Sequence, residues 1–239
     1  MEAIKNRIKD LLPAACDFQG ESMKAREIAR DAYRRAETNK ENVLRIGIDG
    51  LVAQLASNMA NRIANTDEKS SYQVSLVTSY IRSHFLINDM ILDGDIVEAT
   101  TLIRKQLECL TRVHELDANP LAKLMKKTPN VINCFKSVGK KIYPHLSEIA
   151  HFATPRVGEL LHVVEDGDLV GPSLHPRYTK AAHGSFDLQA LISIYFLFWL
   201  IEKQKSWYPS IDSTSNMAVL YSVFQIALDS GVISNGETA

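Results

Sequence analysis

Apolar residues along most of the chain recur at the three- and four-residue spacing that places them on one face of an α-helix. Pro13 is expected to end the first helix, because a proline inside a helix removes one backbone hydrogen bond. The fold class predicted from this pattern is mostly α, a multi-helix bundle. The helices are expected at residues 2–12, 21–37, 41–65, 70–92, 95–116, 119–127, 129–140, 144–152, 185–206 and 213–230.

The period changes between residues 159 and 175, where short apolar runs replace the helical pattern. Leu160–Val164 and Leu169–Val170 flank Asp166-Gly167, a dipeptide that strongly favours a two-residue hairpin turn. We therefore predict one β-hairpin insertion at about 159–175. Because two strands alone are only marginally stable, this hairpin is expected to lie on the helical body.

A short junction separates the predicted helices 70–92 and 95–116. Gly94 can adopt the left-handed conformation that ends a helix. Asp95 is expected to cap the next helix, with Glu98 three residues later as the second member of a capping box. The same residues could begin a calcium loop, but the remaining spaced ligands of such a loop are missing. We therefore interpret the junction as a tight turn between antiparallel helices.

The composition is that of a globular protein. The 239 residues are 46% hydrophobic and 23% charged, and this length suits a single helical domain over 1–239. Residues 1–38 form a possible N-terminal helical extension of that domain. The formal net charge of −1 supplies no global basic field, so RNA binding is possible but is not supported by the net charge.

The cysteines and the most apolar segment favour a cytoplasmic protein. Cys16, Cys109 and Cys134 are widely spaced and form no C-x-x-C motif, which is typical of reduced thiols. The most apolar run, Leu188–Ile201, has 14 residues, fewer than the roughly 20 that cross a bilayer. We interpret it as a buried core helix and expect no membrane contact. The N-terminus also lacks the apolar segment of a secretory signal.

The predicted helix 95–116 has a broad apolar surface and a narrow polar arc that contains Arg104 and Glu108. These two residues are four apart, so they can form an ion pair on one face. The arc either is a solvated stripe or faces a cleft between helices, where it would hold a ligand or orient His151. We name Arg104, Glu108 and His151 as candidate catalytic residues.

A second polar cluster follows Pro144, where Ser147, Glu148 and His151 lie close together along one helix. Ser147 and Glu148 are candidate binding residues, and either can hydrogen-bond with His151 in a local structural network. A carboxylate beside His151 could also orient it for acid–base chemistry. Glu148-Ile-Ala-His151 has the Glu-x-x-His spacing of di-metal helical proteins, but no second copy converges on it. No metal or other cofactor is therefore predicted.

The predicted helix 21–37 has two distinct faces. Arg26, Arg30 and Arg34 recur every fourth residue among acidic neighbours, so they form either a solvated stripe or a strip that binds phosphate. The other face, which suits a protein partner, consists of four alanines, Ala25, Ala29, Ala32 and Ala36. A homo-oligomer and a protein partner are therefore the expected partners.

Two short motifs in this helical frame are Leu102-Ile-Arg104-Lys-Gln-Leu-Glu108 and Tyr143-x-x-Leu-Ser-Glu-x-x-His151. In these motifs, and over about residues 70–205, the chain resembles a bacterial helical family allied to the HEPN superfamily. HEPN proteins are often RNases or components of toxin and phage-defence systems, and they commonly act as dimers. The resemblance implies a shared pocket lined by Arg104, Glu108, Ser147, Glu148 and His151.

HEPN RNases carry an Arg followed after four to six residues by a His on one helix. This spacing occurs at Arg156–His162, which crosses Gly158 into a predicted strand, and at Arg177–His183, in a predicted loop. We therefore favour a non-catalytic helical module that binds a protein partner, in stress or phage defence. The alternatives left open are an RNase or other phosphodiester-directed enzyme that uses His151 and Arg104, and a metal-dependent helical enzyme.

Overall fold

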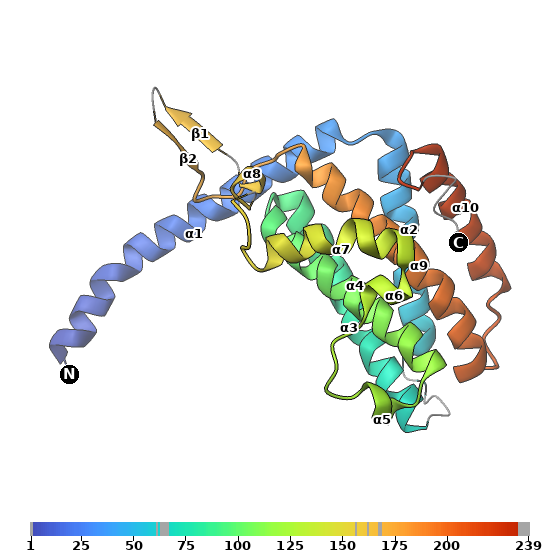
Figure 1. Ribbon diagram of the computed structural model, residues 1–239. Coiled ribbons are helices and arrows are strands. Elements are labelled where there is room, and N and C mark those ends of the chain that lie inside the picture. The colour runs from blue at the N-terminus through green and yellow to red at the C-terminus, as the bar shows by residue number, and fades with distance from the viewer. Residues whose placement is uncertain are drawn as a thin grey trace.

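The computed structural model is a mostly helical bundle from which one long helix projects (Figure 1). The structure describes residues 2–60, 62, 67–155, 157–161, 163–166 and 169–233. The predicted mostly α class is confirmed. Within these residues the chain forms ten helices and two strands, which are α1 (Glu2–Ala36), α2 (Asn39–Met59), α3 (Glu68–Asp93), α4 (Ile96–Ala118), α5 (Leu121–Leu124), α6 (Val131–Cys134), α7 (Lys136–Ala150), α8 (Val157–Leu160), β1 (Val163–Asp166), β2 (Leu169–Pro172), α9 (Ala181–Trp207) and α10 (Thr214–Asp229).

Helix α9 forms the centre of the hydrophobic core and packs against α2, α3, α4 and α10 (Figure 1). Its apolar side chains surround the helix axis, and Phe196, Leu197 and Leu200 are fully enclosed. The predicted buried helix at Leu188–Ile201 is therefore confirmed. By length and composition alone, α9 with its 27 residues could cross a membrane, while 72% of its most apolar window is buried inside the protein.

Two helix boundaries predicted at prolines are wrong, because both prolines lie inside continuous helices. Helix α1 runs through Pro13, and α7 begins at Lys136, well before Pro144. A proline in a helix removes one backbone hydrogen bond, but the helix can continue where the freed carbonyl group reaches water. Pro13 and Pro144 are both exposed, so this solvation is available at each position.

The turn between α3 and α4 contains the predicted left-handed glycine. Gly94 has a φ of +85°, and a β-carbon on it would lie 2.5 Å from the carbonyl oxygen of Arg177. Glycine is therefore required here both for its conformation and for the close approach of the backbone. The predicted N-cap position of Asp95 is confirmed, but its predicted capping hydrogen bond is not. Asp95 makes no capping hydrogen bond, because its carboxylate instead accepts hydrogen bonds from Arg26 of α1.

Strands β1 and β2 pair antiparallel inside the range predicted for the hairpin, with Val163 opposite Pro172 at one end. Residues 167 and 168, which belong to the predicted turn, lie outside the described residues. The predicted start at residue 159 is wrong, because Val157–Leu160 forms the helical turn α8, which packs against α4. Figure 1 shows the two strands projecting from the helical body, and not lying on it as expected.

Candidate functional site

A polar cluster lies where α7 packs against α4. It consists of Arg104 and Glu108 from α4, Tyr143 from α7, and His151 directly after the end of α7. The apolar residues of α4 are buried in the core, which leaves its polar arc in contact with α7. The side chains of Arg104 and Glu108 are 16% and 24% exposed, so the cluster lies at the edge of the helix interface.

Arg104, Glu108 and Tyr143 form a closed triangle of hydrogen bonds. Arg104 Nε donates to Glu108 Oε1 over 3.0 Å, and Arg104 Nη2 donates to the Tyr143 hydroxyl over 3.2 Å. The Tyr143 hydroxyl in turn donates to Glu108 Oε1 over 2.8 Å. The guanidinium carbon of Arg104 also lies 5.4 Å from the centre of the Tyr143 ring. These contacts hold the guanidinium in one position.

Burial and charge act on the pKa values of this cluster in different directions. Burial lowers the pKa of Arg104, but the hydrogen bond with Tyr143 and the negative charge of Glu108 outweigh burial and raise it. Burial and the neighbouring Glu108 carboxylate raise the pKa of Tyr143, against the lowering effect of Arg104. At neutral pH, Arg104 is therefore a cation and the Tyr143 hydroxyl is a neutral donor.

His151 completes the cluster from the end of α7. Arg104 Nη1 donates to His151 Nε2 over 2.6 Å. Because a guanidinium can only donate, Nε2 acts as the acceptor in this contact. His151 is exposed to solvent. At this exposed position, the Arg104 cation can bind an anion, and the imidazole beside it can exchange a proton with a ligand.

The structure brings together three of the five predicted site residues, since both Glu108 and His151 contact Arg104. Ser147 and Glu148 are half-buried. Within the described part of the chain, neither of them makes a side-chain hydrogen bond with His151. The expected local network does not form there, because His151 ends the helix and its ring contacts Arg104 instead.

Tyr143 is a member of the cluster that the sequence interpretation did not include among the site residues. Its signal in the sequence was its place at the start of the motif Tyr143-x-x-Leu-Ser-Glu-x-x-His151, eight residues before His151. The contact with α4 is what makes this spacing important, because the Tyr143 hydroxyl reaches both Arg104 and Glu108.

Of the two Arg–His pairs with HEPN spacing, the structure describes Arg177–His183, and this pair does not form a cluster of this kind. Arg156 and His162 lie outside the described residues. His183 contacts Glu41 through its Nδ1 over 2.6 Å, while Arg177 is exposed in the loop before α9. His183 therefore belongs to a network with α2, and Arg177 is not part of that contact.

The metal-dependent alternative has no support in the described residues. Among them, no group of three or more His, Cys, Asp and Glu side chains converges as metal ligands would. Glu148 and His151 therefore lack further ligands in this part of the chain. The other Glu-x-x-His sequence ends at His162, which lies outside the described residues.

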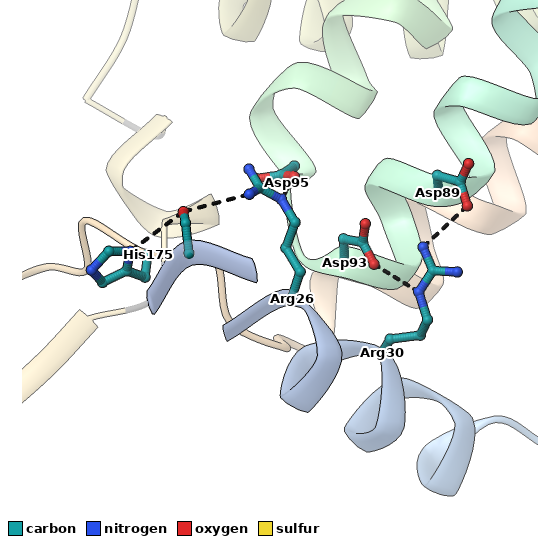
Figure 2. Close-up of polar contacts among 7 residues, drawn as sticks. Arg26, Arg30, Asp89, Asp93, Asp95 and His175 are labelled. Carbon is teal, nitrogen blue, oxygen red and sulfur yellow. Dashed lines mark hydrogen bonds and ion pairs between the residues drawn. The ribbon is translucent and has the colours of Figure 1, made fainter. Parts of the chain in front are cut away.

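The arginine stripe of α1 pairs with the turn between α3 and α4 (Figure 2). Arg26 Nε donates to Asp95 over 3.0 Å. Arg30 donates to Asp93 over 2.8 Å and to Asp89 over 3.1 Å. Figure 2 shows the two guanidinium groups reaching from α1 to this acidic corner. For Arg26 and Arg30, the interpretations as a solvated stripe and as a phosphate-binding strip are both wrong, because ion pairs attach α1 to the body.

Comparisons with known proteins add no family to these observations. Protein-family models, curated proteins and solved structures all give no match to this chain. The resemblance to the HEPN superfamily therefore stays a prediction, and the function has to be inferred from the contacts and exposed surfaces of the chain itself.

Proposed function

We propose that this protein is a non-catalytic helical module that binds another protein through the projecting part of α1. The observation that carries this proposal is the exposed apolar surface of that segment. Every side chain from Ile8 to Gln19 is exposed, and Figure 1 shows this part of α1 extending away from the body. The exposed fractions of its large apolar side chains are 56% for Ile8, 67% for Leu11, 56% for Leu12 and 47% for Phe18.

These apolar residues follow the three-four spacing of a coiled-coil surface. Ile8, Leu11, Ala15 and Phe18 lie on one helix face, and Leu12 lies beside it. A continuous face of exposed large apolar side chains is typical of a surface that binds another protein. An amphipathic helix of this kind packs its apolar face against a groove or against a second helix.

The projecting segment also lacks the packing that normally stabilises a helix. Isolated helices of this length are marginal in water, and most helical stability in proteins comes from tertiary contacts. Pro13 adds a cost of about 3 kcal/mol in a helix interior. Because the side chains from Ile8 to Gln19 are exposed, packing within the chain offsets little of this cost. Contact with a partner would supply the missing packing.

The alanine face that was expected to bind a partner is only partly covered within the chain, and Ala36 is exposed. Ala29 is 1% exposed. Ala25 and Ala32 line a cavity of about 460 Å³ together with Pro176 and Tyr178 of the loop before α9. The interaction surface that we propose is therefore the larger apolar face on the N-terminal side of these alanines.

The proposed setting is the cytoplasm, with a role in stress or phage defence. Cys16, Cys109 and Cys134 are all free thiols, which fits a reducing compartment. The defence role rests on the resemblance to the HEPN superfamily, whose members commonly act as dimers.

Cross-linking in intact cells tests the proposed function. The variants are wild type, the double variant Leu11→Glu/Phe18→Glu, and Asp10→Asn as a control on the other side of the helix. We expect cross-linked species of higher mass with wild type and Asp10→Asn, and their loss with the double variant. The same species in all three samples would contradict the proposal, because binding would then not depend on the apolar face.

A second candidate function is supported by one contact, the 2.6 Å hydrogen bond between Arg104 and His151. In a phosphodiester-directed enzyme, Arg104 would bind the phosphate and His151 would act as general acid or base. Incubation of mixed RNA with wild type, Arg104→Ala and His151→Ala tests this function. Cleavage that is lost in both variants would support it. No cleavage by wild type, or unchanged cleavage in both variants, would exclude it.

A further inference from the structure

The apolar face of α1 between Ile8 and Phe18 matches a second copy of itself. Resting on the proposed interaction function, we infer that two copies of this protein pair through this segment, with the helices antiparallel and crossing near Pro13. The product is a two-helix antiparallel coiled coil with one helical body at each end.

The apolar face is complementary to the same face of a second copy whose helix runs in the opposite direction. In the antiparallel pair, Leu11 of each copy packs beside Ala15 of the other, and Ile8 packs beside Phe18. The two central layers each combine a large and a small side chain, and Leu12 from both copies covers one side of the centre. Parallel pairing would instead place Ala15 against Ala15 and Phe18 against Phe18. One layer would then be underfilled and the other overfilled, which costs stability.

The attachment of the body also favours the antiparallel direction. The body meets α1 from Phe18 onward, where the His175 ring lies 4.7 Å from the Phe18 ring and pairs with Glu21 over 3.4 Å. Figure 1 shows the first part of α1 extending away from this attachment. Parallel helices would bring two bodies to the same end of the pair. Antiparallel helices place the bodies at opposite ends and leave the apolar faces free to meet.

The charged residues of the segment do not oppose this pairing. Lys9, Asp10 and Asp17 project from the other side of the helix, and so does Pro13. The contact face between Ile8 and Phe18 therefore contains no charge that would have to be buried. The proline ring also lies outside the contact, where it does not disturb packing between the helices.

The available surface suits a reversible dimer. Four large apolar side chains in each copy are about half exposed or more. Their burial in both copies removes on the order of 1,000 Å² from solvent, near the lower limit of specific protein–protein interfaces. We therefore expect the monomer and the dimer to exchange with protein concentration.

Cysteine cross-linking tests both the partner and its direction. In the antiparallel pair, Ala14 of one copy lies opposite Ala14 of the other at the edge of the contact, with helix axes about 8–10 Å apart. Cys16 points away from the contact in both copies. The variant Ala14→Cys/Cys16→Ser is compared with the wild type, using a short bis-maleimide. Burial raises the pKa of Cys109 to about 12 and that of Cys134 to about 11, so these thiols react slowly.

We expect a covalent dimer from Ala14→Cys/Cys16→Ser in at least tenfold higher yield than from wild-type Cys16, and a dimer mass by light scattering. Adding Leu11→Glu is expected to return the monomer.

A wild-type monomer at all concentrations overturns self-pairing, and so does a dimer in which Ala14→Cys cross-links no better than Cys16. Species from intact cells that depend on Leu11 but contain a different protein overturn self-pairing and keep the interaction function. Species that do not depend on Leu11 and Phe18 overturn the interaction function itself.

Discussion

The two halves of α1 share one helical period but are stabilised in different ways. In the second half, Ala29 and Tyr33 are buried, and Arg26 and Arg30 form ion pairs with the turn between α3 and α4. In the first half, every side chain from Ile8 to Gln19 is exposed. The docked half combines small apolar side chains with arginines that meet an acidic corner in the same chain. The projecting half carries large apolar side chains that stay about half exposed or more, although Phe18 lies beside the His175 ring.

The comparison shows that amphipathic character alone does not decide where a helix packs. The docked half depends on a corner built around Gly94, whose backbone closely approaches Arg177. The projecting half is proposed to depend on contacts with a second protein molecule. Substitutions in the corner should therefore change folding stability, whereas substitutions on the projecting face should change association only.

The largest effect is expected from Gly94→Ala, because it distorts the corner on which α1 docks. A φ of +85° is strained for alanine, and the new β-carbon would lie 2.5 Å from the carbonyl oxygen of Arg177. We expect the free energy of unfolding to fall by about 3 kcal/mol. Chemical denaturation followed by circular dichroism measures this change.

Gly20→Ala is the matched control in α1. An added β-carbon on Gly20 would meet no atom within 4 Å. Alanine in a helix is preferred over glycine by about 0.5–1 kcal/mol, so this substitution is expected to leave the fold intact or stabilise it slightly. Equal destabilisation by both substitutions would contradict the special role of Gly94.

Leu11→Glu is expected to weaken association without unfolding the body. A charge placed in the apolar contact should weaken self-association at least tenfold, about 1.4 kcal/mol. The melting temperature of the dilute protein should not change, because Leu11 is 67% exposed and has no place in the core. Sedimentation velocity and thermal unfolding measure the two effects. A fall in melting temperature with unchanged association would contradict the assignment of Leu11 to the association surface and would place it in the core instead.

Arg30→Ala is expected to weaken the docked half by a smaller amount. Its ion pairs with Asp93 and Asp89 are partly exposed, so their loss should cost about 1 kcal/mol or less of unfolding free energy. The cost should shrink at high salt, since exposed ion pairs are screened. Arg34→Ala is the control, because Arg34 is exposed on the same helix. If both variants unfold at the same denaturant concentration as wild type, the ion pairs do not hold α1 in place.

Pro13→Ala is expected to have the smallest effect on the body. The free energy of unfolding of the body should stay within about 0.5 kcal/mol of wild type. The projecting segment can lose its helix without unfolding the body, so relief of the proline cost affects only the helix content of that segment. Helix content by circular dichroism should rise slightly, and self-association should persist. Loss of the dimer in this variant would place Pro13 inside the contact and would contradict the antiparallel arrangement.

The patterns that predicted structure correctly are those that act over a few residues. The conformation of Gly94 follows from the absence of a β-carbon, and the buried α9 follows from an apolar run with no polar face. The Arg104–Glu108 ion pair likewise follows from a spacing of four residues. These features could be read from the sequence because the residues that decide them are close neighbours.

The expectations that failed depended on distant residues. Asp95 was expected to cap α4, but its carboxylate meets Arg26, which is 69 residues away in sequence. His151 was expected to hydrogen-bond within its own helix, but it contacts Arg104, which is 47 residues away. A sequence pattern predicts a hydrogen-bond or ion-pair partner that is close along the chain. Tertiary packing can place a stronger partner from a distant part of the chain beside the same side chain.

Short-range patterns are enough to place most helices, the helix that is buried on all sides, and the left-handed glycine that ends α3. Long-range packing sets which arginines meet which aspartates, whether Arg104 and His151 touch, and which half of α1 is covered. The difference arises from the range of the forces involved. Backbone propensity and apolar periodicity act along a few helical turns, whereas the partner of an ionic or polar group is selected only after packing brings distant elements within a few ångströms of one another.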